Sequence, residues 1–168
     1  MCQKKGFTLT ETILIVALII ILSSFTLASH RQGERLFSLQ RAAHKLAQDL
    51  SYARDMAMRG QKTPASCGGI FPSGGYGLSF IINSNSYVLF ADCNNNGQYD
   101  FPEKIEEIFL ESRIIISDLP DSPLSITFFP PDPSITITPD SSSAKVTLFL
   151  DGSTKEIFFT TAGLIDID

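Results

Sequence analysis

The sequence predicts an α+β fold, in which one long N-terminal helix packs on a small antiparallel β-sheet head. Residues 12–29 form an apolar run without a charged side chain, and residues 36–57 repeat apolar side chains at spacings of three and four. After Gly60, apolar residues alternate with polar ones in short runs separated by Gly, Pro, Asn and Ser. The chain of 168 residues, 43% of them hydrophobic, suits one modest domain plus an N-terminal segment.

The apolar run at 12–29 has the length of a single membrane span. At 1.5 Å per residue, a helix over this run is roughly 27 Å long, close to the hydrocarbon thickness of a bilayer. Lys4 and Lys5 precede it and, by the positive-inside tendency, stay in the cytoplasm. The chain beyond His30 is therefore predicted to be exported.

An ordinary secretory signal is an alternative interpretation of the same segment. A short basic region, an apolar region and the small residues Thr26 and Ala28 also fit a signal peptide that is cleaved after Ala28. Glu11 argues against this interpretation, because a carboxylate at hydrocarbon depth is costly unless it has a partner.

The start of the chain resembles a known processing signal. The residues KKGFTLTE, at positions 4–11, stand directly before the apolar helix. This resembles the signal of type IV pilins and type II secretion pseudopilins. The resemblance implies that a prepilin peptidase cuts between Gly6 and Phe7. It also implies that Phe7 is then N-methylated and that Glu11 becomes the fifth residue of the mature chain.

Cleavage after Gly6 would supply a partner for Glu11. The freed α-amino group of Phe7 has an ordinary pKa near 8 and is cationic at neutral pH. In a filament, Glu11 of one subunit is expected to neutralise the Phe7 amine of its neighbour, since the two charges are tolerable in lipid only together. The alternative is that Glu11 merely lies at the headgroup edge of a membrane anchor.

The helix is expected to run from Phe7 to Arg59. A bend is an alternative at Ser23 and Ser24 or at Gly33. Gly60 is the expected C-cap, and Pro64 prevents continuation. The apolar stripe of its second half is expected to pack against the protein's own head, and consists of Leu36, Leu39, Ala43, Leu46, Leu50, Ala53 and Ala57. The predicted organisation is a leader at 1–6, an assembly and transmembrane half at 7–29, an amphipathic half at 30–60 and an exported β-rich head at 61–168.

The head is predicted to consist of short antiparallel strands. Asp151 and Gly152 suggest a two-residue hairpin turn, and a four-residue loop that ends at Thr154 is equally open. The short β-rich head and the tail TTAGLIDI most resemble minor pilins of the GspH/FimT type. The expected strands are GYGLSFII, SYVLFA, KIEEIFL, RIIIS, LSITFF, SITIT, AKVTLFL and KEIFFT.

The cysteines predict one disulfide. Cys2 would leave with the leader, and Cys67 and Cys93 would remain in an exported head, where oxidising conditions favour their pairing. Two free thiols are the alternative. Since no Cys-x-x-Cys pair or neighbouring His is present, a redox or zinc site is not expected.

Residues 92–103, DCNNNGQYDFPE, match the calcium-loop pattern D-x-[DN]-x-[DN]-G-x5-E. A hard cation needs six to eight oxygen ligands, and Gly97 permits the sharp turn that directs alternate side chains inward. Pro102 departs from the usual loop and could displace Glu103. A turn without metal is the alternative to structural Ca²⁺. The candidate ligands are Asp92, Asn94, Asn96, the Gln98 carbonyl, Asp100 and Glu103.

Charge is distributed unevenly along the chain. Seven of the thirteen Lys and Arg lie between Arg31 and Lys62, whereas from Thr63 onward four bases face fourteen acids, so 4 − 14 = −10. An acidic head repels phosphates, and direct nucleic-acid binding is therefore not expected. No catalytic group is expected either, because His30 and His44 each stand apart from a nucleophile or a metal cluster.

These observations predict a structural subunit, a minor pilin or pseudopilin of a type IV pilus or a type II secretion pseudopilus, and not an enzyme. The resemblance implies as partners other pilin or pseudopilin subunits, a prepilin peptidase and an inner-membrane assembly platform. It also implies a single-pass inner-membrane precursor and then a periplasmic or surface filament. The alternative is an anchored or secreted calcium-binding or adhesive β domain.

Overall fold

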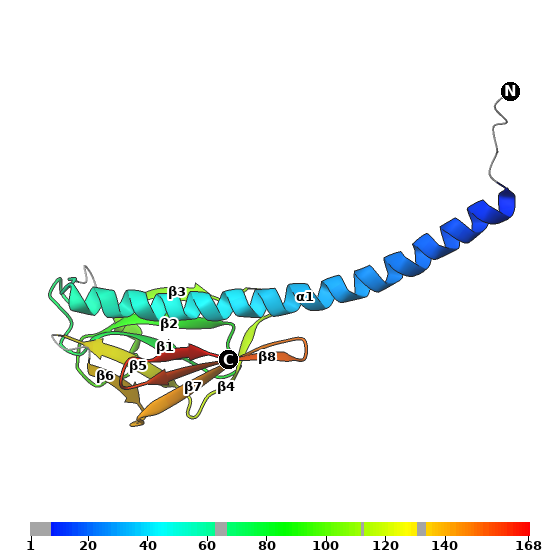
Figure 1. Cartoon of the computed structure of the whole chain (residues 1–168). Helices are drawn as coiled ribbons and strands as arrows, with labels where there is room; N and C mark the ends of the chain where they lie inside the picture. The colour runs from blue at the N-terminus through cyan, green and yellow to red at the C-terminus, as the bar shows by residue number, and fades with distance from the viewer. Residues whose placement is uncertain (1–7, 63–66, 112, 131–133) are drawn as a thin grey trace. The chain divides into compact units, whose positions relative to one another are not determined.

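The structure is a computed structural model of the whole chain (Figure 1). It describes all residues except 1–7, 63–66, 112 and 131–133, and it describes no side chains for 25–32. The chain divides into two compact units, Met1–Phe37 and Ser38–Asp168, and each is described by itself.

One helix, α1 (Leu9–Met58), belongs to both units. Its helical conformation continues through Ser23, Ser24 and Gly33, the positions at which the sequence allows a bend. At its end, the Gly60 N–H donates to the Ala57 carbonyl (3.1 Å) and the Gln61 N–H to the Met56 carbonyl (3.1 Å), with Gly60 at φ +59°. This is a Schellman cap, and it confirms Gly60 as the C-cap.

In the first unit, the described apolar side chains of α1 are exposed: Leu14 is 61% exposed and Leu22 is 65% exposed. Among the described residues, no helix has an apolar stretch long enough to cross a membrane. The predicted span at 12–29 includes residues 25–29, whose side chains lie outside the described part.

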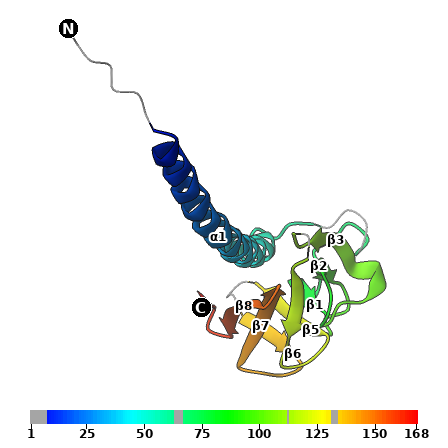
Figure 2. The same cartoon turned by 90° about the vertical axis from the view of Figure 1, so that its right-hand side faces the viewer.

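The second unit contains two antiparallel sheets (Figures 1 and 2). The first sheet has five strands in the order β3-β2-β1-β5-β6, so β3 and β6 are its edges, and the second has four in the order β4-β7-β8-β9. The strands are β1 (Gly75–Phe80), β2 (Ser86–Asp92), β3 (Lys104–Phe109), β4 (Ile115–Asp118), β5 (Leu124–Phe129), β6 (Ser134–Thr138), β7 (Ser143–Leu150), β8 (Ser153–Thr160) and β9 (Ile165–Ile167).

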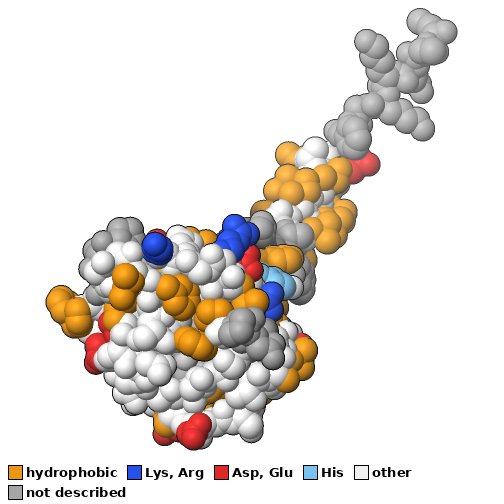
Figure 3. Space-filling view, turned by 90° about the vertical axis from the view of Figure 1, so that its left-hand side faces the viewer, with side chains coloured by type: hydrophobic (Ala, Val, Ile, Leu, Met, Phe, Trp, Pro, Cys, Tyr) orange, Lys and Arg blue, Asp and Glu red, His pale blue; other side chains and the backbone are white. Residues whose placement is uncertain are grey.

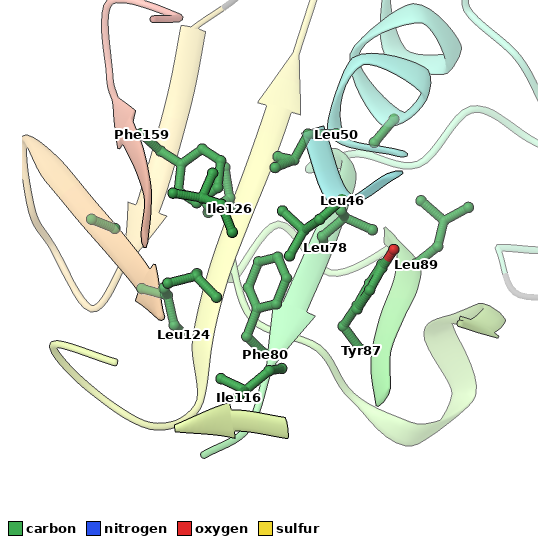
Figure 4. Close-up of a cluster of buried hydrophobic side chains, with 14 of the residues drawn as sticks. Leu46, Leu50, Leu78, Phe80, Tyr87, Leu89, Ile116, Leu124, Ile126 and Phe159 are labelled. Carbon is green, nitrogen blue, oxygen red and sulfur yellow. The ribbon is translucent and has the colours of Figure 1, made fainter. Parts of the chain in front are cut away.

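The core lies where α1 and the two sheets meet. Figure 4 shows Leu46 and Leu50 of α1 gathered with Leu78 of β1 and Ile126 of β5, and each of these side chains is at most 1% exposed. The stripe predicted on the helix is buried from Leu39 to Ala57. Leu36 is 52% exposed within the first unit, and its packing against the head stays a prediction. Leu36 precedes the unit that contains the head.

The α+β class and every predicted strand are confirmed, with three refinements. The strands divide between two sheets, and the tail adds the short strand β9, which had not been expected. A single 3-10 turn, η1 (Phe101–Glu103), precedes β3. Leu150 pairs with Ser153 across Asp151 (φ 46°) and Gly152 (φ 90°), so the two-residue hairpin is the correct alternative.

Candidate functional site

The loop at 92–103 joins β2 to β3 and begins at Asp92, the last residue of β2. Its sharp turn is made by Asn95 (φ 60°) and Gly97 (φ 70°), both in the left-handed region. A Cβ atom on Gly97 would also lie 2.8 Å from Thr138 Oγ1 of β6, which is too close. The loop therefore needs glycine at the position that the sequence predicted.

Two of the predicted calcium ligands are buried carboxylates that bind the loop's own backbone. Asp92 is 1% exposed, and its two oxygens accept the N–H groups of Asn96 (3.2 Å) and Gly97 (2.8 Å). Glu103 is 2% exposed, and its oxygens accept the N–H groups of Cys93 (2.9 Å) and Asp100 (3.1 Å). These bonds hold the two ends of the loop together.

The turn η1 explains where the Glu103 side chain lies. Pro102 is in the middle of this turn, and the Glu103 N–H donates to the Asp100 carbonyl at 2.9 Å. The tight turn directs the Glu103 carboxylate back to the Asp100 N–H. In this structure the Glu103 carboxylate therefore binds the backbone of the loop itself.

The side chains of two other predicted ligands, Asn94 and Asn96, converge on one carboxylate oxygen of a third, Asp100. Asp100 Oδ2 accepts from Asn94 Nδ2 (2.8 Å) and from Asn96 Nδ2 (3.0 Å), while each amide oxygen accepts a backbone N–H two residues ahead. In this arrangement the amide nitrogens, not the oxygens, face Asp100. As the side chains stand, no group of three or more His, Cys, Asp or Glu among the described residues could hold a metal ion. Amide and carbonyl oxygens, which Ca²⁺ also accepts as ligands, are not part of such groups.

The predicted disulfide is present between Cys67 and Cys93, with a Cα–Cα distance of 5.4 Å. Cys93 follows Asp92 directly, and its N–H is bound by Glu103. The bridge therefore joins the segment after α1 to the candidate calcium loop. Cys2 lies outside the described residues.

Two polar contacts between α1 and the head were not foreseen. The Arg41 guanidinium donates to both oxygens of Glu111 (2.6 and 2.9 Å), and the Ser38 hydroxyl donates to Glu111 Oε2 (2.6 Å). The hydrogen bond from Arg41, followed by that from Ser38, lowers the pKa of the Glu111 carboxyl. These partners are about 70 residues apart in the sequence, and no local pattern joins them.

The second contact lies beneath the helix. The Tyr87 hydroxyl of β2 donates to Asp49 Oδ2 of α1 at 2.5 Å. Burial, followed by the hydrogen bond to Asp49, raises the pKa of Tyr87 far above its ordinary value. Tyr87 therefore stays protonated and keeps donating to Asp49 at any physiological pH.

The N-terminal candidates are only partly within the described residues. Gly6 and Phe7 lie outside them. Glu11 is exposed in the first turn of α1, where its N–H donates to Thr8 Oγ1 at 3.4 Å. Thr8 followed by Glu11 is the spacing of a capping box, and this gives Glu11 a second possible role at the helix start. Of the two histidines, His44 is exposed on α1 and the His30 side chain is not described.

Figure 3 looks onto the end of the head at which α1 ends. Hydrophobic side chains are scattered among polar ones on this face, and the visible Lys and Arg side chains lie toward its upper and right-hand rim. The exposed hydrophobic residues of the second unit include Ile70, Phe101 and Phe129.

Comparison with known proteins gives one match. No curated protein and no solved structure matches the chain. A family model described as type II transport protein GspH matches residues 42–163, which is more than half of the chain and includes most of the buried half of α1 and most of the head. This family consists of structural pseudopilins of type II secretion, whose expected partners are other pseudopilins. The chain therefore belongs to the type II transport protein GspH family.

Proposed function

We propose that the protein is a minor pseudopilin that is processed between Gly6 and Phe7 and enters a secretion filament through the first half of α1. The observation that carries this proposal is the family match at 42–163, joined to the processing signal KKGFTLTE at 4–11. The two features occupy different parts of the chain, so each supports the proposal independently.

The exposed apolar surface of α1 before Phe37 supports assembly through that segment. Side chains such as Ile13, Leu14 and Leu18 are at least half exposed, and burying each of them in lipid or against another subunit is favourable by about 1.5–3 kcal/mol. We propose that the precursor lies in the inner membrane with its head outside. A prepilin peptidase and an inner-membrane assembly platform are its proposed partners.

The N-terminus of the mature protein tests the processing step. Mass spectrometry of the protein from its native membrane should give a chain that begins with N-methylated Phe7. A chain that begins at Ser29 would instead indicate release by signal peptidase. A chain that begins at Met1 would indicate an uncleaved anchor, and with it the alternative of an anchored adhesive or calcium-binding domain.

Within the filament, Glu11 is proposed to neutralise the Phe7 amine of a neighbouring subunit. Glu11 also lies in the first helical turn, where a carboxylate stabilises the start of the helix. This is a competing explanation for any effect of replacing Glu11. Glu11→Gln separates the two roles, since glutamine can still form a capping box but carries no charge. Filament incorporation should fall in Glu11→Gln as far as in Glu11→Ala. Normal incorporation of Glu11→Gln would leave only the capping role.

We also propose that the loop at 92–103 binds structural Ca²⁺. Asp92, Asp100 and Glu103 form no ion pair with Lys or Arg in the part of the chain that the structure describes, and two of them are almost fully buried. Buried negative charge without a counter-ion is costly. Rotation of the Asn94 and Asn96 amides would place their oxygens beside Asp100 Oδ2, as a hard cation requires.

Thermal unfolding of the full chain tests the calcium proposal. Calcium at a hundred times its dissociation constant should stabilise the protein by about 2.7 kcal/mol relative to chelator, seen as a higher Tm. Asp100→Asn should abolish this difference, and Asp121→Asn, an exposed acid in another loop, should preserve it. Equal Tm values for the native protein with calcium and with chelator would show that the loop is a turn without metal.

A further inference from the structure

A cavity of about 340 Å³ lies between the loop at 92–97 and the face of the first sheet that turns away from the core. On β5 and β6, the residues that line it alternate with the core residues Ile126, Phe128 and Ile137. Its volume lies within the range of pockets for small ligands, about 300–1,000 Å³. The lining residues that matter here are Asp92, Asn95, Thr127, Phe129, Ser134 and Thr136.

The size of this cavity sets it apart from a second one beneath α1. The cavity beside Leu50, Ile126 and Phe159 has a volume of about 20 Å³, enough for a single water molecule. It is therefore a packing gap of the core. The cavity beside the loop, in contrast, has room for one or two six-membered rings.

The charge of the cavity disfavours anionic ligands. Among the described residues that line it, there is one carboxylate, that of Asp92, and there is no Lys, Arg or His. A phosphate, a nucleotide or an organic acid would meet a negative charge without a cation to bind it. A neutral ligand fits this lining.

The polar groups of the cavity offer both donors and acceptors. In the described part of the chain, the Asn95 amide and the Thr136 hydroxyl have no hydrogen-bond partner, and both residues are exposed. The Ser134 hydroxyl donates to the Phe129 carbonyl at 3.3 Å and can still accept. Each Asp92 oxygen accepts one backbone N–H and has a second lone pair. A ligand with several hydroxyl groups can form hydrogen bonds with both the donors and the acceptors of this cavity.

Phe129 adds an apolar surface to these polar groups. Its ring is 42% exposed at the end of β5 and lines the same cavity. Aliphatic C–H groups pack well on an aromatic face, while the hydroxyls around the ring of a sugar need polar partners. We propose that this cavity binds a neutral mono- or disaccharide, with one sugar ring on Phe129 and its hydroxyls bound by Asn95, Ser134 and Thr136.

Saturation-transfer NMR on the full chain tests this inference with cellobiose, maltose, lactose and chitobiose as probes. The protein is kept in a detergent without a sugar headgroup, since a maltoside would compete. Chelator is present, so that binding through a metal ion does not contribute. At least one probe should bind saturably with a millimolar Kd. Saturable binding of none of the four would overturn the proposal.

Two variants and two matched controls locate the binding. Asn95→Gly removes the amide and tolerates the positive φ, and Asn83→Gly makes the same change at φ 60° in the turn between β1 and β2. Phe129→Ala removes the aromatic surface, and Phe109→Ala removes a more exposed ring, 61% exposed, on β3. The first member of each pair should weaken binding about tenfold, the effect of losing one good contact of about 1.4 kcal/mol. Equal binding by all four variants would overturn the proposal.

Discussion

The two halves of α1 have the same secondary structure and similar apolar residues, yet they differ in what covers those residues. Leu14 and Leu18 in the first half are 61% and 50% exposed, whereas Leu46 and Leu50 in the second half are 0% and 1% exposed. The difference arises because the second half belongs to the unit that contains the sheets. The apolar surface of the second half is thus buried by the sheets of its own unit. Among the described residues, the apolar surface of the first half is not covered by any part of its own unit.

The family match begins at residue 42, inside the buried half, and continues through most of the head. Side chains that pack in the core must complement one another in shape. The exposed half has no such partner within its unit, and its apolar surface requires only lipid or another subunit. Residues that stabilise the folded head and residues that mediate assembly are therefore separable by mutation.

The largest expected effect is that of Leu46→Ala. Removal of a fully buried leucine side chain should destabilise the head by about 3–5 kcal/mol, through lost burial and the cavity that remains. Urea unfolding followed by near-ultraviolet circular dichroism measures this change. Leu14→Ala is the matched control and should leave head stability within about 0.5 kcal/mol. An equal loss in both variants would contradict the proposed separation of the two halves.

The second-largest expected effect is that of removing the disulfide between Cys67, in the segment that follows α1, and Cys93. Replacing Cys67 and Cys93 by serine should lower head stability by about 3 kcal/mol, because the bridge closes a loop with a sequence separation of 26. The same urea titration measures it. Cys2→Ser provides the control, since a cysteine in a removed leader cannot affect the mature protein. A loss of stability in Cys2→Ser would count against removal of the leader.

A smaller effect is expected at the polar contact beneath α1. Tyr87→Phe removes the hydroxyl that donates to Asp49 and should cost about 1–2 kcal/mol, because the half-buried carboxylate loses a donor. Tyr52→Phe changes the same group on the exposed side of the helix, where Tyr52 is 52% exposed, and should have no measurable effect. Matching stabilities for the two variants would show that the Tyr87 contact does not stabilise the head.

The smallest effect is a pH dependence at the start of the buried half. Hydrogen bonds from Arg41 and Ser38 lower the pKa of Glu111, so this contact stabilises the head above the ordinary glutamate pKa, about 4.3. The stabilisation is lost as pH falls through the lowered pKa of the folded state. Its size should stay below about 1 kcal/mol, since the carboxylate is 41% exposed.

A double-mutant cycle with Glu111→Gln and Arg41→Gln, with urea unfolding measured across acidic pH, isolates this contribution. The two changes should be non-additive near neutral pH and additive at a pH below the pKa of Glu111. Additivity at every pH would show that the ion pair adds nothing to stability.

The sequence could predict most of the helix and strands because their periodicity is local. Alternating runs identified β1 to β8, and Gly60 with Pro64 identified the end of α1. The strand β9 was not predicted, because its three residues, Ile165 to Ile167, are too few to show an alternating pattern. Division into two sheets depends on distant pairings such as that of β1 with β5, which no local pattern encodes.

The candidate site shows the same limit. The spacing from Asp92 to Glu103 was visible in the sequence, and so was the disulfide partner of Cys93. Glu103 turning back onto the Asp100 N–H depends on the geometry of η1, which spacing does not give. The cavity combines the loop with Thr127, Phe129, Ser134 and Thr136 of the sheet, so it exists only after β5 has paired with β1 and β6 with β5.

The edges of the first sheet have a consequence for the unassembled protein. The edge strand β3 carries Lys104, Glu106 and Glu107, and charged side chains on an edge strand discourage pairing between two copies. The other edge, β6, consists of Ser, Ile and Thr and carries no charge at all. An uncharged edge strand favours edge-to-edge pairing, so we expect copies that accumulate faster than they are used to pair along 134–138.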